Sequence, residues 1–302
     1  MKFLFFCMAI LQIAGGCRSV SRQQLKVVRQ FAGKTEDFSA YPEKIMKGIA
    51  ETREARGVWY AGSFTDPDQH LAELNSIVRE RINNDRIPGR IRTIFKIMDD
   101  YARGLEALSS DAPFKAQKIL YGRLGSDLDE LVVQYNLMSI GHKLPSGTGT
   151  VLTMSMNVTT NTVLAHRQMK ALKRFVNQAD TLVSDLCTEM VKFLSSDGIG
   201  QLIDAEESGV QESFRFYYTK RSNPVIESDK EFIALMKTVE ELKNLRNLTI
   251  RAAGNLKSAH KMLVAEINQK KSLAETIFYL NNFYKDMDEL NNAFREVKAL
   301  GP

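Results

Sequence analysis

Apolar residues recur along this chain at helical spacing, and runs of alternating β-branched residues are almost absent. The clearest pattern covers residues 151–193, where alternating steps of three and four residues meet mostly apolar side chains. Such spacing predicts one long helix with a narrow bundle or coiled-coil seam. At 1.5 Å per residue this helix would be about 65 Å long, which is more than a compact domain requires. We therefore expect an all-α fold, an elongated helical bundle with long coiled-coil-like antiparallel helices.

The C-terminal part carries two more apolar stripes, one beginning at Phe232 and the other at Leu273. Between them, Ala252-Ala253-Gly254 fits a close helix crossing or a bend. Two helices joined within 257–271 would bury both stripes as a hairpin, and we favour this arrangement over one very long helix. Before the first stripe, residues 195–200 predict a kink or stop, and a shorter helix is expected at about 201–218.

Prolines mark the helix starts of the N-terminal half. Proline is tolerated in the first turn because its missing N–H would have no partner there. Pro42 and Pro67 occupy such positions, and Asp66 could cap the second helix. Helices are expected at about 21–32, 42–62, 67–84, 88–108 and 113–140. We divide the chain into an N-terminal helical region, 41–144, and a long-helix bundle, 145–302, packed against it.

The first seventeen residues have a different character. Lys2 precedes an apolar run at 3–13 that only Gln12 interrupts, and small residues follow. A transmembrane helix needs roughly 20 apolar residues, so this run is too short to span a membrane and predicts an export signal.

The sequence Ala14-Gly15-Gly16-Cys17 resembles the lipobox of bacterial lipoproteins. The resemblance implies that 1–16 is a signal peptide, that Cys17 becomes the lipidated N-terminus, and that 17–40 forms a tether and a short helix. Two or more acyl chains, such as palmitate, anchor a protein stably. Arg18 favours the outer membrane in the enteric sorting scheme. The alternative is an ordinary secretory signal and a soluble periplasmic or secreted protein.

Charge and cysteine content narrow the classes of partner and of reactive site that the chain could have. The formal net charge is +5, and no nucleic-acid-binding module is present, so we expect no nucleic-acid partner. Outside the signal region Cys187 is the single cysteine, and its apolar neighbours predict a buried, inert thiol.

Motifs for catalysis or metal binding are missing. The four histidines (His70, His142, His166 and His260) form no H-E-x-x-H pair, so neither a metal nor another cofactor is expected. The Gly-rich loop 144–150 lacks the Lys-Ser/Thr pair of a P-loop and predicts a turn between helices. Acidic groups at 99–100, 127–130 and 286–289 predict solvated helix faces. The chain is expected not to be an enzyme.

Two aromatic groups stay open to two interpretations. Trp59-Tyr60 and the segment Phe214–Tyr218 could pack between helices or form an exposed patch for a partner or a membrane surface. Four aromatic residues within 214–218 cannot all share one helical stripe.

These observations support three hypotheses for function. The preferred one is a lipid-anchored helical protein of the bacterial cell envelope, acting as a structural or protein-interaction module. Its partners would be the membrane, through the lipid on Cys17, and other envelope proteins. The second is a subunit of an envelope secretion or transport assembly, in which oligomers are expected. The third is an exported enzyme or small-ligand binder with a site made by long-range contacts.

Overall fold

The computed structural model describes residues 22–84, 89–110, 114–139, 142–156, 164–220 and 225–300, and these are helical apart from short connections, without strands. The all-α prediction is confirmed. Lipobox residues 14–17 lie outside the described residues. The elements are α2 (Arg22–Ser39), α3 (Tyr41–Gly62), α4 (Pro67–Asn84), α5 (Gly89–Ser109), α6 (Phe114–Met138), α7 (Thr148–Met156), α8 (Leu164–Leu194), the π-turn η1 (Ser196–Gly200), α9 (Gln201–Lys220), α10 (Ile226–Ile267) and α11 (Leu273–Leu300).

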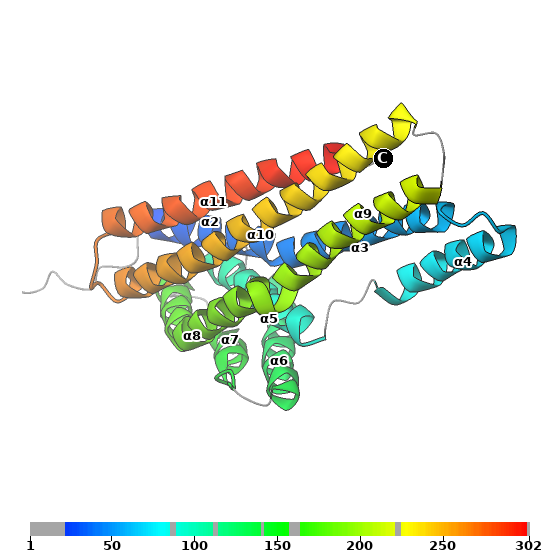
Figure 1. Cartoon of the computed structure of the whole chain (residues 1–302). Coiled ribbons are helices and arrows are strands. Elements are labelled where there is room, and N and C mark those ends of the chain that lie inside the picture. Colours follow the sequence, from blue (N-terminus) through cyan, green and yellow to red (C-terminus); the bar gives the residue numbers. More distant parts are fainter. Residues whose placement is uncertain are drawn as a thin grey trace, which may run out of the picture.

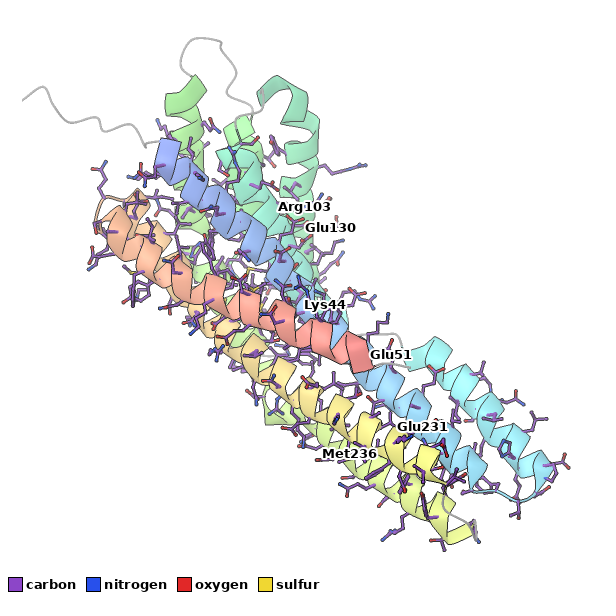
Figure 2. The ribbon with its side chains drawn as sticks, turned by 90° about the horizontal axis from the view of Figure 1, so that it is seen from above. Lys44, Glu51, Arg103, Glu130, Glu231 and Met236 are labelled. Carbon is purple, nitrogen blue, oxygen red and sulfur yellow. The ribbon has the colours of Figure 1, made fainter. Side chains whose placement is uncertain are left out.

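The molecule is arranged along α10, which has 42 residues and is therefore about 63 Å long. Helices α2 and α3 follow one another along the same direction on the other side of the bundle, as Figures 1 and 2 show. We call the end at which α2 begins and α10 ends the proximal end. The distal end holds α4, the C-terminal part of α3 and the C-terminal part of α9 (Figure 1).

The expected C-terminal hairpin is present. Chain reversal takes place in 268–272, where Gln269 has a positive φ of 60°, and α11 then packs along α10. Ser272 and Glu275 form a capping box: the Ser272 amide donates to the Glu275 carboxylate at 3.0 Å, and the Glu275 amide donates to Ser272 Oγ at 3.2 Å. Helix α10 continues without interruption through the buried Ala252 and Ala253, so the alternative of a bend there is wrong.

The single long helix expected at 151–193 is wrong. The chain forms α7 and α8 instead, and these two helices pack against each other, which one continuous helix could not do. Residues 157–163 between them lie outside the described residues. The apolar stripe itself is correct within α8, where Leu172, Phe175 and Leu186 are fully buried.

Other helix boundaries agree closely with the sequence. Helices α3, α4 and α9 differ from expectation by two residues or fewer, and the kink at 195–200 is η1. Helix α2 is longer than expected because its buried stripe continues beyond Gly33, through Thr35 and Phe38.

A close crossing of two glycines fixes α7 on α6. A methyl group on Gly149 would collide with the carbonyl oxygen of Gly125, so the two backbones touch only because neither residue has a side chain. Beside this crossing, the Asp129 carboxylate accepts hydrogen bonds from the amides of Gly149 at 2.9 Å and Thr150 at 2.7 Å. The Gly-rich loop therefore leads into a helix N-terminus that is capped by the chain's own carboxylate.

One hydrophobic core joins the described helices other than α4. It runs from Phe31 and Tyr41 through Tyr101 and Phe175 to Leu290, and it takes residues from both sides of position 145. No helix in the described part of the chain is both long and apolar enough to cross a membrane.

The glycine crossing makes a testable prediction. Gly149→Ala should lower the free energy of unfolding by about 2 kcal/mol, because the added methyl group forces two backbones apart. Gly122→Ala, also in α6, meets nothing within 4 Å and should raise it by up to about 1 kcal/mol. Urea unfolding measures both, and equal effects of the two variants would contradict the crossing.

Candidate functional site

A cleft of about 920 Å³ lies at the distal end. Helices α3, α4 and α9 form its walls, and Arg92 of α5 also reaches it. In Figure 2, α4 lies beside α3, with the labelled Glu51 at the inner end of the pair. Its apolar lining comprises Met46, Ala50, Tyr60, Ile77 and Phe216, and its charged lining comprises Glu43, Lys47, Glu51, Arg53, Glu54, Arg56, Glu73, Arg92 and Glu212.

A buried carboxylate fastens the two main walls together. Glu206 of α9 is 1% exposed, and it accepts from Arg53 Nη2 at 2.5 Å and from Arg56 Nε at 2.6 Å. Gly209, one helical turn further along α9, leaves room for the Arg56 guanidinium, because a Cβ there would lie 2.7 Å from Arg56 Nε. Both arginines are therefore held by the protein itself, although their outer atoms line the cleft.

The aromatic groups resolve into an inner and an outer set. Trp59 packs between helices, with ring centroids 5.5 Å from Phe214 and 4.7 Å from Tyr217, and Phe214 continues the contact to Phe232 of α10. Phe216 lies on the cleft and is 48% exposed. Packing between helices is therefore confirmed for Trp59 and Phe214, whereas Phe216 is the exposed member of the segment and its role as a patch for a partner stays a prediction.

Helix α4 is the least anchored wall. None of its side chains described, at 67–79, is buried, and Leu71 and Val78 are 58% and 60% exposed. Its half-buried face includes Ile77, which lies over Gly57 of α3. This helix closes one side of the cleft through a small contact area.

The lining of the cleft combines charged and apolar side chains. Its lining contains carboxylates and guanidiniums close to apolar and aromatic groups, and neither histidine nor cysteine lines it. Within the described residues no His, Cys, Asp and Glu cluster is arranged to hold a metal ion. The expected absence of a cofactor stays a prediction.

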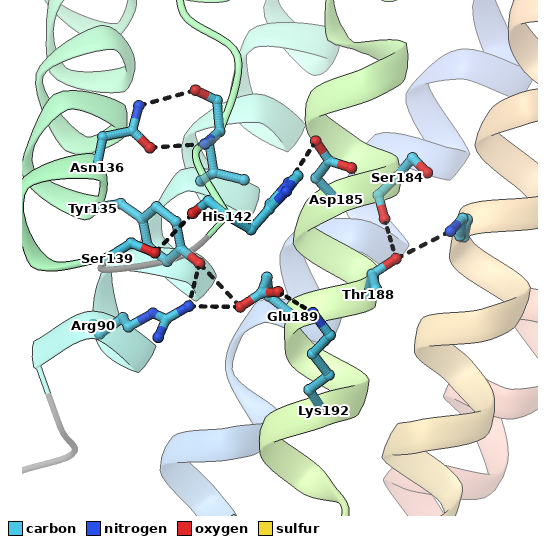
Figure 3. Close-up of polar contacts among 12 residues, drawn as sticks. Arg90, Tyr135, Asn136, Ser139, His142, Ser184, Asp185, Thr188, Glu189 and Lys192 are labelled. Carbon is cyan, nitrogen blue, oxygen red and sulfur yellow. Dashed lines mark hydrogen bonds and ion pairs between the residues drawn. The ribbon is translucent and has the colours of Figure 1, made fainter.

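A second polar cluster joins α5, α6 and α8 (Figure 3). Glu189 accepts from Arg90 at 2.7 Å, from Tyr135 at 3.1 Å and from Lys192 at 2.7 Å. Burial raises the pKa of Glu189, but the hydrogen bonds from Lys192 and Tyr135 outweigh it and leave this pKa below its ordinary value. Arg90, Tyr135 and Lys192 all pair with Glu189, so the cluster links three helices, and Arg90 Nε is buried without a hydrogen-bond partner among the described residues.

His142 gains an acid partner that sequence reasoning missed. Its Nε2 lies 3.0 Å from the Asp185 carboxylate of α8 (Figure 3). Asn136 of α6 donates to the Leu144 carbonyl and accepts from the Leu144 amide, and Ser139, directly after α6, donates to the His142 carbonyl. Asp185 is far from His142 in sequence, and no local signal could have paired them.

His260 is buried within the bundle. Its Nε2 lies 2.7 Å from the hydroxyl of Tyr101, and its Nδ1 lies 3.4 Å from Asp180. The hydrogen bond with His260 lowers the pKa of Asp180. This chain of polar groups connects α5, α10 and α8, and none of its three residues lines the distal cleft.

Three residues with sequence-based expectations, Cys187, Asp100 and Asp286, are all buried in the structure. Cys187 is a free, buried thiol, as predicted, and burial raises its pKa to about 12. The prediction that the acidic groups face water is wrong for Asp100 and Asp286, which are each 4% exposed. Arg251 and Asn255 donate to Asp286, whereas Asp100 Oδ2 accepts no hydrogen bond from the described residues.

The remaining site residues lie elsewhere. Cys17 lies outside the described residues, as does the side chain of His166. His70 is half-buried on α4 and does not line the cleft. The histidines and acidic groups singled out from sequence therefore do not converge on the cleft, which is lined instead by residues without a local motif.

Comparisons with known proteins identify no relative of this chain. No protein-family model matches the chain, no curated protein is significantly similar to it, and no solved structure matches its fold.

Glu206 provides a test of how the cleft is held together. Glu206→Gln should lower the free energy of unfolding by about 2 kcal/mol or more, because two partly buried guanidiniums lose their counter-charge. Glu212→Gln removes an exposed carboxylate from the same helix and should change it by less than about 0.5 kcal/mol. Urea titration at neutral pH distinguishes them, and a Glu206 variant as stable as the parent would contradict this account.

Burial of Asp100 makes the free energy of unfolding depend on pH. Burial, followed by the neighbouring charge of Asp99, raises the pKa of Asp100 from 3.8 to about 6. The folded state therefore holds the proton more tightly, and stability is lost as pH rises from about 4 to 6. Asp100→Asn should raise the free energy of unfolding by about 2–3 kcal/mol at pH 7.5. It should have little effect at pH 3.5, where the parent carboxyl is mostly protonated in both states.

Asp99→Asn is the matched control for that measurement. Asp99 is more exposed, so its direct contribution is small, and the variant should recover only a minor part of the gain. Equal stability of Asp100→Asn and parent across the whole pH range would contradict the burial of a charged carboxylate.

Proposed function

We propose that this chain is a lipid-anchored, non-enzymatic interaction module of the bacterial envelope, which binds a segment of another envelope protein in its distal cleft. The observation that carries the proposal is the placement of two features at opposite ends of one helical bundle. Helix α2 begins at the proximal end, and the cleft lies at the distal end (Figures 1 and 2).

The distance between a lipid on Cys17 and the start of α2 is limited by the few residues that join them. Cys17 precedes Arg22, the first residue of α2, by five positions. Five residues span at most about 18 Å, so a lipid on Cys17 holds the proximal end close to the membrane. This step rests on the lipobox resemblance of Ala14-Gly15-Gly16-Cys17.

The intervening helices act as a spacer. Helices α10 and α11 form an antiparallel, coiled-coil-like pair in which Leu256, Leu263 and Leu290 are fully buried. The length of α10, about 63 Å, places the cleft well away from the anchor. Such a module presents its binding surface to proteins beyond the headgroup region.

The cleft fits an amphipathic protein segment. Phe216 and Tyr60 offer exposed aromatic surface, and aromatic residues with arginine are enriched in protein–protein contacts. Acidic and basic side chains in the lining can pair with charges on both sides of a bound helix. The loosely held α4 lets the cleft adapt to such a segment.

A small-ligand binder is the second candidate, favoured by one observation. The cavity volume of about 920 Å³ lies within the range of small-molecule sites. A third arrangement, a subunit of a secretion or transport assembly, would place a second copy of this chain at the same surface.

Lipid labelling tests the anchor. Cells expressing the parent chain should incorporate labelled palmitate into it, and globomycin should block its processing. Cys17→Ser should remove the label and release the protein from the membrane fraction. Cys7→Ser, in the apolar run, should retain both properties. If Cys17→Ser remained fully processed and membrane-bound, lipidation would be the wrong account.

Site-specific photo-crosslinking in cells tests the cleft. A photo-reactive phenylalanine analogue in place of Phe216 or Tyr60 should give one adduct of discrete mass with an envelope protein. The same analogue in place of Val133, which is 52% exposed on α6, is the control and should not give it. An adduct between two copies would support the assembly instead. Adducts at the control alone would overturn the proposal.

A further inference from the structure

The proximal end carries an uneven distribution of charge. Several elements meet there: the first two turns of α2, the last two turns of α10, the turn 268–272, the first two turns of α11 and residues 170–178 of α8. Gln24 donates to Glu266, and Asn177 and Asn268 hydrogen-bond to each other at 2.6 Å. Both contacts bind elements that are distant in sequence into one surface, which both views show at the same end of the molecule (Figures 1 and 2).

Basic side chains dominate this surface. Within these described stretches the carboxylates are Glu266, which is buried, and Glu275, which pairs with Lys271 at 3.0 Å. The cationic residues of the same stretches whose side chains the structure describes are Lys26, Arg29, Lys170, Lys173, Arg174, Lys261, Lys270 and Lys271. The excess of positive charge is local, since the whole chain carries only +5.

Two aromatic side chains project from the same surface. Phe278 is 63% exposed and Tyr279 is 39% exposed, and their rings meet edge to face with centroids 5.5 Å apart. They lie in the second turn of α11, which follows the turn that contains Lys270 and Lys271. Leu280, next in sequence, is buried.

We propose that the proximal end is a membrane-docking surface, on which Lys270, Lys271, Phe278 and Tyr279 contact the headgroup region of an anionic phospholipid bilayer. This inference rests on the proposed lipidation of Cys17, which tethers α2 within about 18 Å of that bilayer. Aromatic rings are favoured at the headgroup level, and lysines are attracted by anionic lipids. The lipid supplies attachment, and the surface sets the orientation with the cleft pointing away from the membrane.

The single tryptophan of the chain makes the orientation measurable. Trp59 belongs to α3 at the distal end and serves as an internal control. Two variants start from a chain in which Trp59→Phe has removed the native indole. Phe278→Trp then places the single indole at the proximal end, and Leu137→Trp places it on α6 instead. Leu137, 81% exposed on α6, reports an alternative exposed face.

The experiment uses the mature lipidated protein in vesicles of phosphatidylcholine and phosphatidylglycerol with brominated acyl chains. Bromine quenches indole fluorescence at short range, and interfacial side chains enter the headgroup and acyl boundary by about 5–10 Å. The indole of the Phe278→Trp chain should therefore lose at least about half of its emission. Trp59 in the parent and the indole of the Leu137→Trp chain should keep theirs.

Charge reversal tests the role of the lysines. Lys270→Glu with Lys271→Glu, added to the Phe278→Trp chain, should restore most of the emission. Each lysine near an anionic surface contributes about 1 kcal/mol, or about fivefold in the docking equilibrium. Lys230→Glu with Lys237→Glu, exposed positions near the start of α10, is the matched control and should leave the quenching unchanged.

Two failures are distinguishable. If Cys17→Ser labels and fractionates like the parent, the lipid-anchor function fails. If the protein is lipidated and vesicle-bound, but the indole of the Phe278→Trp chain is unquenched or that of the Leu137→Trp chain is quenched instead, only the docking surface is overturned.

Discussion

The fold depends on α10 remaining one uninterrupted helix over 42 residues. Helical propensity alone does not stabilise such a length in water, because most helical stability in proteins comes from packing an apolar face. In α10 that face runs from Val239 to Ile267 and is covered by α3, α8, α9 and α11. Each of these helices takes its position from α10, so the distance between the two ends of the molecule is set by this one burial.

Apolar stripes alone would leave the helices free to slide by one turn, since a shift of that size still buries leucine against leucine. Buried polar groups remove this freedom. Glu206 must meet Arg53 and Arg56, His260 must meet Tyr101, and Asp286 must meet Arg251. A shift by one turn would leave each group buried without its partner, which costs several kcal/mol per charge. The polar contacts thus define the register that burial permits.

Local signals explain which elements could be predicted from sequence. Helices α3 and α4 begin at Pro42 and Pro67 or one residue before, and α9 follows the Gly-containing η1, so their bounds were nearly correct. The stripe over 151–193 keeps its period through α7 and α8, and therefore carries no sign of the break between them. What separates α7 is its crossing at Gly125, a contact that periodicity does not encode.

The cleft could not be predicted from the sequence either, because it also depends on contacts between distant segments of the chain. The ion pair that holds its walls together joins Glu206 to Arg53, 153 positions away, and its lining comes from four helices. Burial of Asp100 and Asp286 was also missed, because an acidic residue on a helix has no local mark that separates a buried face from a solvated one. In each case the missing information was the identity of a partner distant in the chain.

The two ends of the bundle differ in how firmly they are held, and this difference bears on function. At the proximal end, Arg29 donates to the Ser109 carbonyl at 2.5 Å, and Gln168 donates to the carbonyls of Leu108 and Ser110, so the end of α5 is fixed by α2 and α8. At the distal end, α4 has no buried side chain among those described at 67–79. Regions with little buried surface open at low free-energy cost, and binding sites that adapt to a partner are drawn from them. In the anchored module that we propose, a firm base would meet the membrane and a compliant wall would border the cleft, because the attachment must not loosen when the binding site opens.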